Sequence, residues 1–195
     1  MELLSGQEIF LFKGESIGLT IQDFWRFQYS NIFDLQEYIA EFLIAKALCI
    51  DTPYNRNGWT AYDIKYKGKR IEVKETGYFY SWQKIGKHSQ RRLWDIHKTF
   101  VKDNEGNRMK DEYGKDIKER QSDVYVFCLN IGDDFLTSYP LELDNWEFYI
   151  IPTKDINMQC GDHKTISLSK VKKIANNNIS FEDIKSEIDK IVNNL

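Results

Sequence analysis

Two carboxylates and an amine lie close together in residues 62–76, which have the alternating pattern of a β-hairpin. Folding the chain about Lys67-Gly68 places Asp63 opposite Glu72, and the Cβ atoms of such opposed residues lie about 4.5–5.5 Å apart. Because side chains alternate along a strand, Lys74 lies on the same side as Glu72. Two like charges at this distance repel each other unless a cation lies near both. Lys74 relieves part of the repulsion, and a hard divalent cation would relieve more. The pattern therefore predicts a metal site.

A third carboxylate comes from a helix that we expect between Asp34 and Leu48. Asp34-Leu-Gln-Glu37 is a helix start signal, and good helix formers follow it without a breaker. A helix that is apolar nearly all the way round is normally buried. Glu41 shares one stripe of this helix with Tyr38, Ala45 and Leu48, so we expect its carboxylate to lie among apolar side chains.

These residue types are the ones that phosphodiester hydrolysis requires. Carboxylates hold Mg²⁺ against the scissile phosphate, and a cation orients the attacking water and offsets the developing charge. Glu41, Asp63, Glu72 and Lys74 would form such a set if they converged on one divalent ion. The Glu-x-Lys pattern is weak evidence for an active site by itself, because Glu and Lys are abundant and on most strands the pattern is only surface charge. A bulge at Gly68 would also shift the pairing of the hairpin.

In this arrangement the residues resemble the PD-(D/E)xK nuclease superfamily. Asp63 matches the aspartate of the motif, Glu72 its second acid, Lys74 its lysine, and Glu41 the acid that many members carry on the preceding helix. Tyr62 stands where the motif has proline. The resemblance covers residues 34–76 in detail and the later strands in outline. It implies a restriction-endonuclease-like α/β fold, in which a mixed central β-sheet is flanked by α-helices.

From the resemblance we expect a metal-dependent DNA nuclease, more specifically an endonuclease of restriction or repair type, with Mg²⁺ or Mn²⁺ as cofactor. Asp63 and Glu72 would bind the metal, Lys74 would orient the nucleophilic water, and Glu41 would bind or order a second metal or its water shell. The resemblance also implies a homodimer. Two alternatives stay open. One is a non-catalytic module of the same fold that binds nucleic acid or protein, and the other is a hydrolase of a different phosphate compound.

The remaining elements predict a single domain over residues 1–195. Helix starts are expected at Thr20 and Ser180, each followed three residues later by an acid, as in a capping box. Further elements are expected over residues 9–12 (an edge strand or a packed arm), 78–82 (a strand), 123–129 and 146–151 (two apolar strands in the interior of the sheet) and 167–175 (a helix).

A basic, polar insertion is expected at about residues 84–122, with turns near Asp103 and Asp111 and a short helix over 91–98. Between Lys65 and Arg120 the chain has sixteen Lys and Arg against nine Asp and Glu, although its net charge is -3. A basic segment in an acidic protein suits contacts with phosphates, and a solvated surface loop is the alternative. The candidates for contact with the DNA backbone lie near two tryptophans and are Lys84, Lys87, Arg91 and Arg92.

Several other classes of protein are excluded by the sequence. No apolar run approaches the ~18 residues of a membrane span, and no Gly-rich phosphate loop or close Cys/His cluster is present. We expect a cytoplasmic protein with no membrane partner. His88, His97 and His163 fit no ligand pattern and are interpreted as surface histidines. Asp51 and Asp95 have no feature that singles them out.

Overall fold

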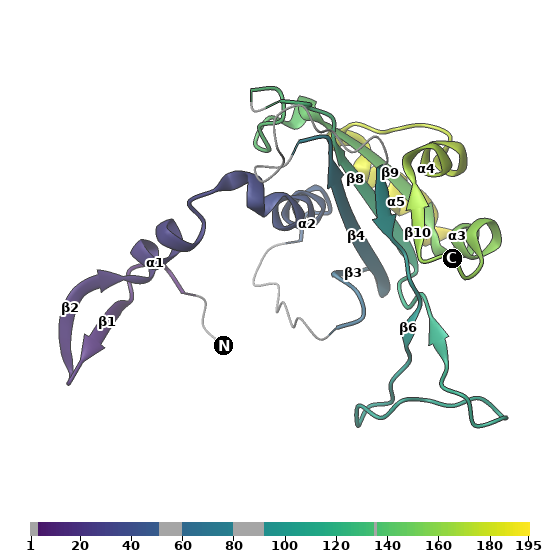
Figure 1. Ribbon diagram of the computed structural model, residues 1–195, viewed down its shortest axis with the longest axis horizontal. Helices are drawn as coiled ribbons and strands as arrows, with labels where there is room; N and C mark the ends of the chain where they lie inside the picture. The colour runs from purple at the N-terminus through teal and green to yellow at the C-terminus, as the bar shows by residue number, and fades with distance from the viewer. Residues whose placement is uncertain (1–3, 51–59, 80–91, 135) are drawn as a thin grey trace.

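The computed structural model describes residues 4–50, 60–79, 92–134 and 136–195. At its centre lies a four-stranded sheet with the order β3-β4-β8-β9 (Figure 1). The strands are β3 (Ile64–Tyr66), β4 (Lys69–Gly77), β8 (Val124–Asn130) and β9 (Trp146–Pro152). β4 and β8 run parallel, whereas the other two pairs are antiparallel. The predicted α/β architecture with a mixed central sheet is therefore confirmed.

The β3–β4 hairpin has three of the predicted pairs, from Tyr66–Lys69 to Ile64–Ile71, and the pairing ends before the predicted Asp63–Glu72 pair. Lys67 and Gly68 both have positive φ, at 48° and 80°. Two central residues with positive φ are the mark of a type I′ turn, whose twist matches that of the flanking strands. Ile64 pairs with Ile71 and Tyr66 with Lys69, so no bulge at Gly68 shifts these pairs.

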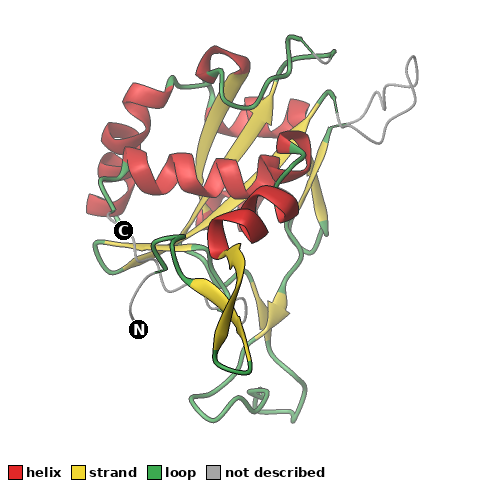
Figure 2. Ribbon diagram, turned by 90° about the vertical axis from the view of Figure 1, so that its left-hand side faces the viewer, coloured by secondary structure: helices red, strands yellow, loops and turns green. Residues whose placement is uncertain are grey.

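Helices cover both faces of the sheet (Figure 2). On one face, α2 (Gln36–Ala47) and α5 (Ile184–Asn193) pack against the apolar side chains of β4, β8 and β9. On the other face lie α3 (Thr153–Cys160), α4 (Leu168–Ala175) and the antiparallel pair of β5 (Leu93–Asp95) and β10 (Thr165–Ser167). None of the helices that the structure describes has the length and apolar character to cross a membrane.

The two apolar strands form as predicted, but only one of them is interior. β8 has neighbours on both sides, and every residue of it is buried, as expected for a continuous apolar run. β9 ends the strand order, so the expected interior position is wrong for this strand. A single bridge between Phe148 and Ile179 covers part of its free edge.

The predicted helices begin near the expected residues. α1 (Ile21–Gln28) has a capping box, in which the Asp23 amide donates to Thr20 Oγ1 at 3.2 Å and the Thr20 amide donates to Asp23 Oδ2 at 2.9 Å. Short 3₁₀ turns, Ile32–Leu35 and Phe181–Asp183, precede α2 and α5, and a third spans Leu143–Asn145. The side chains of Tyr38 and Phe42 are about half exposed, so the expectation that α2 is buried nearly all round is wrong.

Two expectations about residues 78–98 are not met where the structure describes them. The short helix expected over 91–98 is wrong, because Leu93–Asp95 forms strand β5 and pairs with β10. Tyr78 and Phe79 lie outside any strand, since β4 already ends at Gly77. Residues 80–82 of the expected strand lie outside the described part of the chain.

Two parts of the chain project from the domain (Figure 1). The N-terminal arm consists of β1 (Ile9–Phe12), β2 (Glu15–Thr20) and α1, and the second projection is a ribbon that starts with β6 (Thr99–Phe100) and β7 (Lys118–Glu119). The two turns expected in this ribbon are confirmed. The carboxylates of Asp103 and Asp111 each accept hydrogen bonds from amides two and four residues further on, as aspartates in turns commonly do.

Candidate active site

Asp63 lies directly before β3, and its carboxylate binds the neighbouring strand. Its backbone amide donates to the carbonyl of Ile71 at 3.1 Å, and because Ile71 is already paired with Ile64, the regular ladder of the hairpin ends here in a bulge. Asp63 Oδ2 accepts a hydrogen bond of 2.7 Å from the amide of Val73. In a longer β3, this amide would donate to a backbone carbonyl of β3 instead. The hairpin therefore holds the Asp63 carboxylate against β4, next to Glu72 and Lys74.

Lys74 and Glu72 form an ion pair in which both side chains are largely buried. Lys74 Nζ lies 2.6 Å from Glu72 Oε1, with 29% and 17% of the two side chains exposed. Glu72 Oε2 accepts a hydrogen bond of 3.1 Å from Ser122 Oγ. Burial lowers the pKa of Lys74, but the negative charges of Glu72, Asp63 and Glu37 outweigh it and leave this pKa above its usual value. Lys74 is thus a protonated cation. Its positive charge offsets the negative charges of Asp63 and Glu72 and so reduces the repulsion between these two carboxylates.

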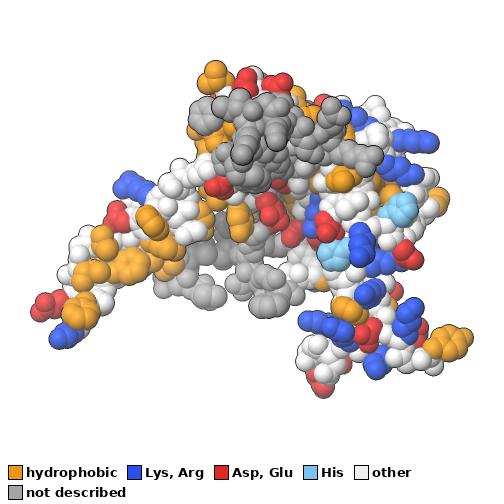
Figure 3. Space-filling view, viewed as in Figure 1, with side chains coloured by type: hydrophobic (Ala, Val, Ile, Leu, Met, Phe, Trp, Pro, Cys, Tyr) orange, Lys and Arg blue, Asp and Glu red, His pale blue; other side chains and the backbone are white. Residues whose placement is uncertain are grey.

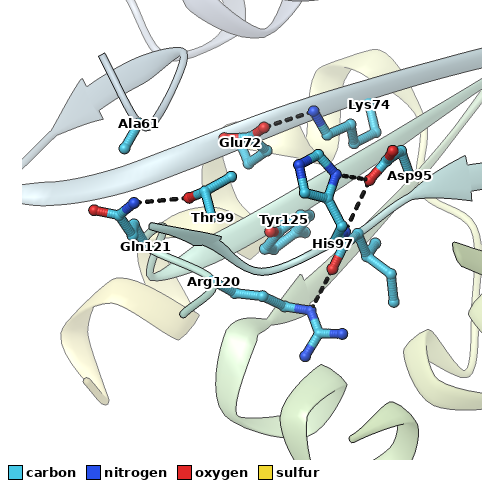
Figure 4. A pocket seen from close by; sticks show the side chains of 10 residues that line it. Ala61, Glu72, Lys74, Asp95, His97, Thr99, Arg120, Gln121 and Tyr125 are labelled. Carbon is cyan, nitrogen blue, oxygen red and sulfur yellow. Dashed lines mark hydrogen bonds and ion pairs between the residues drawn. The ribbon is translucent and has the colours of Figure 1, made fainter. Parts of the chain in front are cut away.

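A cavity of about 50 Å³ opens beside this pair. In the view of Figure 4, Asp95 and His97 lie to the right of Glu72 and below Lys74, and both line the cavity. Asp95 Oδ1 accepts from the amide of His97 at 2.8 Å and also pairs with the ring Nδ1. Burial raises the pKa of Asp95, but the hydrogen bonds and charge of His97 and the charge of Lys74 lower it further, to below its usual value. The cavity is therefore also lined by the ionised carboxylate of Asp95, which orients the imidazole of His97.

Tyr125 also lines the cavity, next to Glu72 in the parallel β4–β8 register. Its side chain is buried. Burial raises the pKa of its phenol, and the charges of Glu72, Asp95 and Asp63 raise it more than Arg120 lowers it. The hydroxyl is therefore a neutral group that can donate a hydrogen bond beside the Glu72–Lys74 pair.

Arg120 joins the Asp95–His97 side of the cavity to the rest of the domain. The residue is 6% exposed. Its Nε donates to the carbonyl of Ile96 at 2.7 Å, between Asp95 and His97. The two Nη atoms donate to the carbonyls of Gly161 and His163, and to Asn157 Oδ1, at 2.7–2.8 Å. These contacts make Arg120 a positioning residue.

Glu41 lies on the other face of the sheet from the cavity. It is buried on α2, and its charge and that of Glu75, after the larger effect of burial, raise the pKa of the Cys128 thiol. Glu75 and Cys128 are opposed in the β4–β8 register, and alternation along β4 puts Glu75 on the opposite side from Glu72 and Lys74. The buried position of Glu41 is as predicted, but the structure does not bring its carboxylate to the other two acids.

In the described part of the chain, no three His, Cys, Asp or Glu side chains gather into a group that could hold a metal ion. The expected convergence of Glu41, Asp63 and Glu72 is therefore not found there, and metal binding by these residues stays a prediction. The pair formed by Asp63 and Glu72 still fits Mg²⁺, which is commonly held by one or two protein carboxylates together with substrate phosphates and several waters.

The chain has no significant match among protein-family models, curated proteins or solved structures. Its chemistry therefore has to be inferred from the residues around the cavity. These residues include three side chains, Asp95, His97 and Tyr125, to which the sequence analysis gave no role. The available signal was the spacing Asp95-Ile-His97, because an aspartate commonly accepts hydrogen bonds from the residue two positions further on. The interpretation of His97 as a plain surface histidine omits its contact with Asp95.

The expected DNA contacts can be placed for one residue. Lys84, Lys87 and Arg91 lie outside the described residues. Arg92 is 6% exposed. Its guanidinium lies 4.3 Å from the centre of the Tyr78 ring, and its Nη2 donates to the Tyr78 carbonyl at 3.3 Å. Arg92 is therefore not a solvated surface cation.

Proposed function

We propose that this protein is a metal-dependent DNA endonuclease with a restriction-endonuclease-like fold. The observation that carries the proposal is the ion pair of Glu72 and Lys74 at one cavity, with the charge of Asp63 also acting on Lys74. In the proposal these residues are the acid, acid and lysine of the PD-(D/E)xK pattern, carried by the β3–β4 hairpin and the residue before it.

The proposed roles follow from the protonation states. Asp63 and Glu72 would hold Mg²⁺, which supplies Lewis-acid stabilisation of the phosphate when it is bound. Lys74 is protonated, so it donates a hydrogen bond to the attacking water or to a phosphate oxygen and is not a general base. Asp95 fixes the Nδ1 side of His97, so the imidazole Nε2 is the atom that can exchange a proton with water in the cavity.

The second candidate function is a binding module without catalysis. It is favoured by the lack of a gathered three-ligand group among the described residues and by the pairing of both Glu72 oxygens with Lys74 and Ser122. Such a module would bind nucleic acid or protein without a divalent ion. The two functions therefore differ in their response to Mg²⁺.

Substituting Asp63→Asn tests the proposed function. Incubated with plasmid and Mg²⁺ or Mn²⁺, the native protein should cut the DNA, and the variant should be slower by about 100-fold or more, because a neutral amide binds the ion poorly. Mg²⁺ should also raise the melting temperature of the native protein and not that of the variant. The side-chain oxygen of the introduced amide can still accept from the Val73 backbone N–H, so the hairpin should remain folded.

The matched control is Asp144→Asn, since Asp144 is exposed and does not line the cavity. This variant should cut like the native protein. A contaminating nuclease would cut equally in every lane. Equal cutting by Asp63→Asn in otherwise nuclease-free preparations would contradict the proposal, and a native protein that neither cuts DNA nor responds to Mg²⁺ would favour the binding module.

A homodimer is part of the same proposal, and the N-terminal arm supports it. Leu11, Phe12 and Phe27 are 59%, 65% and 81% exposed, and large exposed apolar patches commonly mark protein interfaces. We expect the native protein to sediment as a dimer and the double variant Phe12→Asp, Phe27→Asp to sediment as a monomer with an unchanged circular dichroism spectrum. A monomeric native protein would overturn this part of the proposal.

A further inference from the structure

A second cavity, of about 600 Å³, lies where Arg92 meets the first turn of α4. Arg92, Tyr78, Ser167, Ser169 and Lys172 contribute to its lining, and none of the described side chains around it is acidic. The cavity beside Glu72 differs, because it contains carboxylates. Figure 3 shows Lys and Arg side chains on the right-hand part of the molecule, where α4 lies in Figure 1. The second cavity is thus suited to a negatively charged ligand.

Arg92 lacks an acceptor inside this cavity. The residue is more than nine-tenths buried, and its Nε has no hydrogen-bond partner among the described residues. Its guanidinium is held in place by the Tyr78 ring and carbonyl. No described carboxylate pairs with it. A guanidinium that lines a cavity and has no carboxylate partner stays positively charged there, so an anion in the cavity would be stabilised by a charge-assisted interaction with it.

The start of α4 is the second donor group. The amide of Leu168 donates to the carbonyl of Arg92 at 3.0 Å, so the helix begins directly beside the Arg92 backbone, and both residues line the cavity. Ser167 caps the helix by accepting from the Lys170 amide, and its Oγ lies 3.1 Å from Ser169 Oγ. The first amides of a helix and the positive end of its dipole favour anions. The hydroxyl of the serine pair whose proton is not used between the two side chains can donate to the same ligand.

Lys172 lies at the rim of the cavity and is half exposed. Its Nζ lies 3.3 Å from Glu147 Oε2, so part of its charge is already offset. A guanidinium, one serine hydroxyl and a helix start offer the ligand donors from several directions. A phosphate group has oxygens in all of these directions, whereas a carboxylate has two oxygens in one plane.

We propose that this second cavity binds a backbone phosphate of the nucleic acid whose neighbouring segment enters the cavity at Lys74. The inference rests on the proposed function and adds a substrate-anchoring site to it. Strand β5 connects the two cavities, because Leu93 lines the second and Asp95 the first. Two residues of extended strand span roughly 7 Å, which is close to the rise of two base pairs along a DNA strand.

The test measures the affinity of the full-length protein for a fluorescent DNA duplex in EDTA, so that no cleavage occurs. Arg92→Gln should weaken binding about 10-fold and lower the slope of log affinity against log salt by about one phosphate contact. Ser169→Glu should have a similar effect, because it places a negative charge in the cavity. A glutamate is favourable in the first turn of a helix, so this second variant should stay folded even if Arg92→Gln does not.

Arg26→Gln is the control, since Arg26 lies on α1 with a side chain that is 72% exposed and its loss changes the net charge equally. It should leave affinity and salt slope unchanged. Inorganic phosphate is the competing ligand. If it raises the melting temperature of the native protein but not of Ser169→Glu, while DNA affinity is the same in both, the site holds free phosphate and the inference is wrong. Unchanged DNA affinity in both cavity variants also overturns it.

These outcomes can be separated from a failure of the proposed function. Cleavage of plasmid by the native protein together with unchanged affinity of the cavity variants would remove only the anchoring site. Loss of affinity in the cavity variants without any metal-dependent cleavage would remove only the nuclease activity and would favour a nucleic-acid-binding module.

Discussion

Lys74→Ala should abolish DNA cleavage and leave DNA affinity within about twofold of the native value. The ammonium is a single charge at 2.6 Å from Glu72, and it is held protonated by the carboxylates around it. Removing one donor that stabilises developing charge typically lowers kcat by about 10²–10³-fold. Binding should be spared because affinity for DNA comes from many phosphate contacts and not from this one amine. Single-turnover cleavage and fluorescence anisotropy measure the two quantities.

Lys65→Ala is the matched control, because Lys65 is an exposed lysine of the same hairpin that does not line the cavity. It should cut at the native rate. Cleavage by Lys74→Ala at a rate comparable with the control would show that the assigned role is wrong. A loss of binding as large as the loss of cleavage would make Lys74 a substrate contact and not a residue of the chemical step.

The raised pKa of Lys74 also predicts how the stability of the protein depends on pH. The pKa of Lys74 is raised in the folded state, so its favourable interaction with the carboxylates is present below the unfolded pKa of about 10.4 and is lost as pH rises through the folded pKa. The melting temperature of the native protein should therefore fall more steeply than that of Lys74→Ala above about pH 10.

The hairpin could be predicted because its signals are local. A strand has a period of two, so the order of Asp63, Ile64, Ile71 and Glu72 determines which side chains share a side once the turn is known. Lys67-Gly68 supplies that turn, and the structure has three of the expected pairs. The capping box of α1 and the apolar runs of β8 and β9 are likewise contained in a few consecutive residues.

The rest of the candidate site depends on contacts between distant segments. Helical periodicity predicts that Glu41 is buried, but not which face of the sheet α2 covers, because that depends on packing against β4 and α5. Asp95 reaches the cavity only because β5 pairs with β10, about 70 residues further along the chain. The polar residues around β5 showed no strand pattern of their own, so a helix was expected where pairing with β10 stabilises a strand.

Arg120→Ala should produce the largest loss of stability of the substitutions considered. The buried guanidinium donates to the carbonyls of Ile96, Gly161 and His163, and to the side chain of Asn157. Alanine would leave the buried Ile96 carbonyl and three partly buried acceptors without their donor and would create a void. Each unsatisfied buried group costs about 1–3 kcal/mol, so the free energy of unfolding should fall by about 3 kcal/mol or more. For a chain of this size that corresponds to a melting temperature lower by roughly 6–12 °C.

Arg108→Ala provides the comparison, because Arg108 is half exposed on the ribbon and pairs with Asp116 at 3.1 Å. Exposed pairs of this kind contribute about 0–1 kcal/mol, so its urea midpoint should hardly move. Arg120→Lys should rescue only part of the loss, since one ammonium cannot reach acceptors that lie around a planar guanidinium. The Ile96 carbonyl lies between Asp95 and His97, so the folded fraction of Arg120→Ala should also cleave DNA more slowly than native protein. Equal urea midpoints for the two alanine variants would mean that the contacts of Arg120 do not hold this side of the cavity in place.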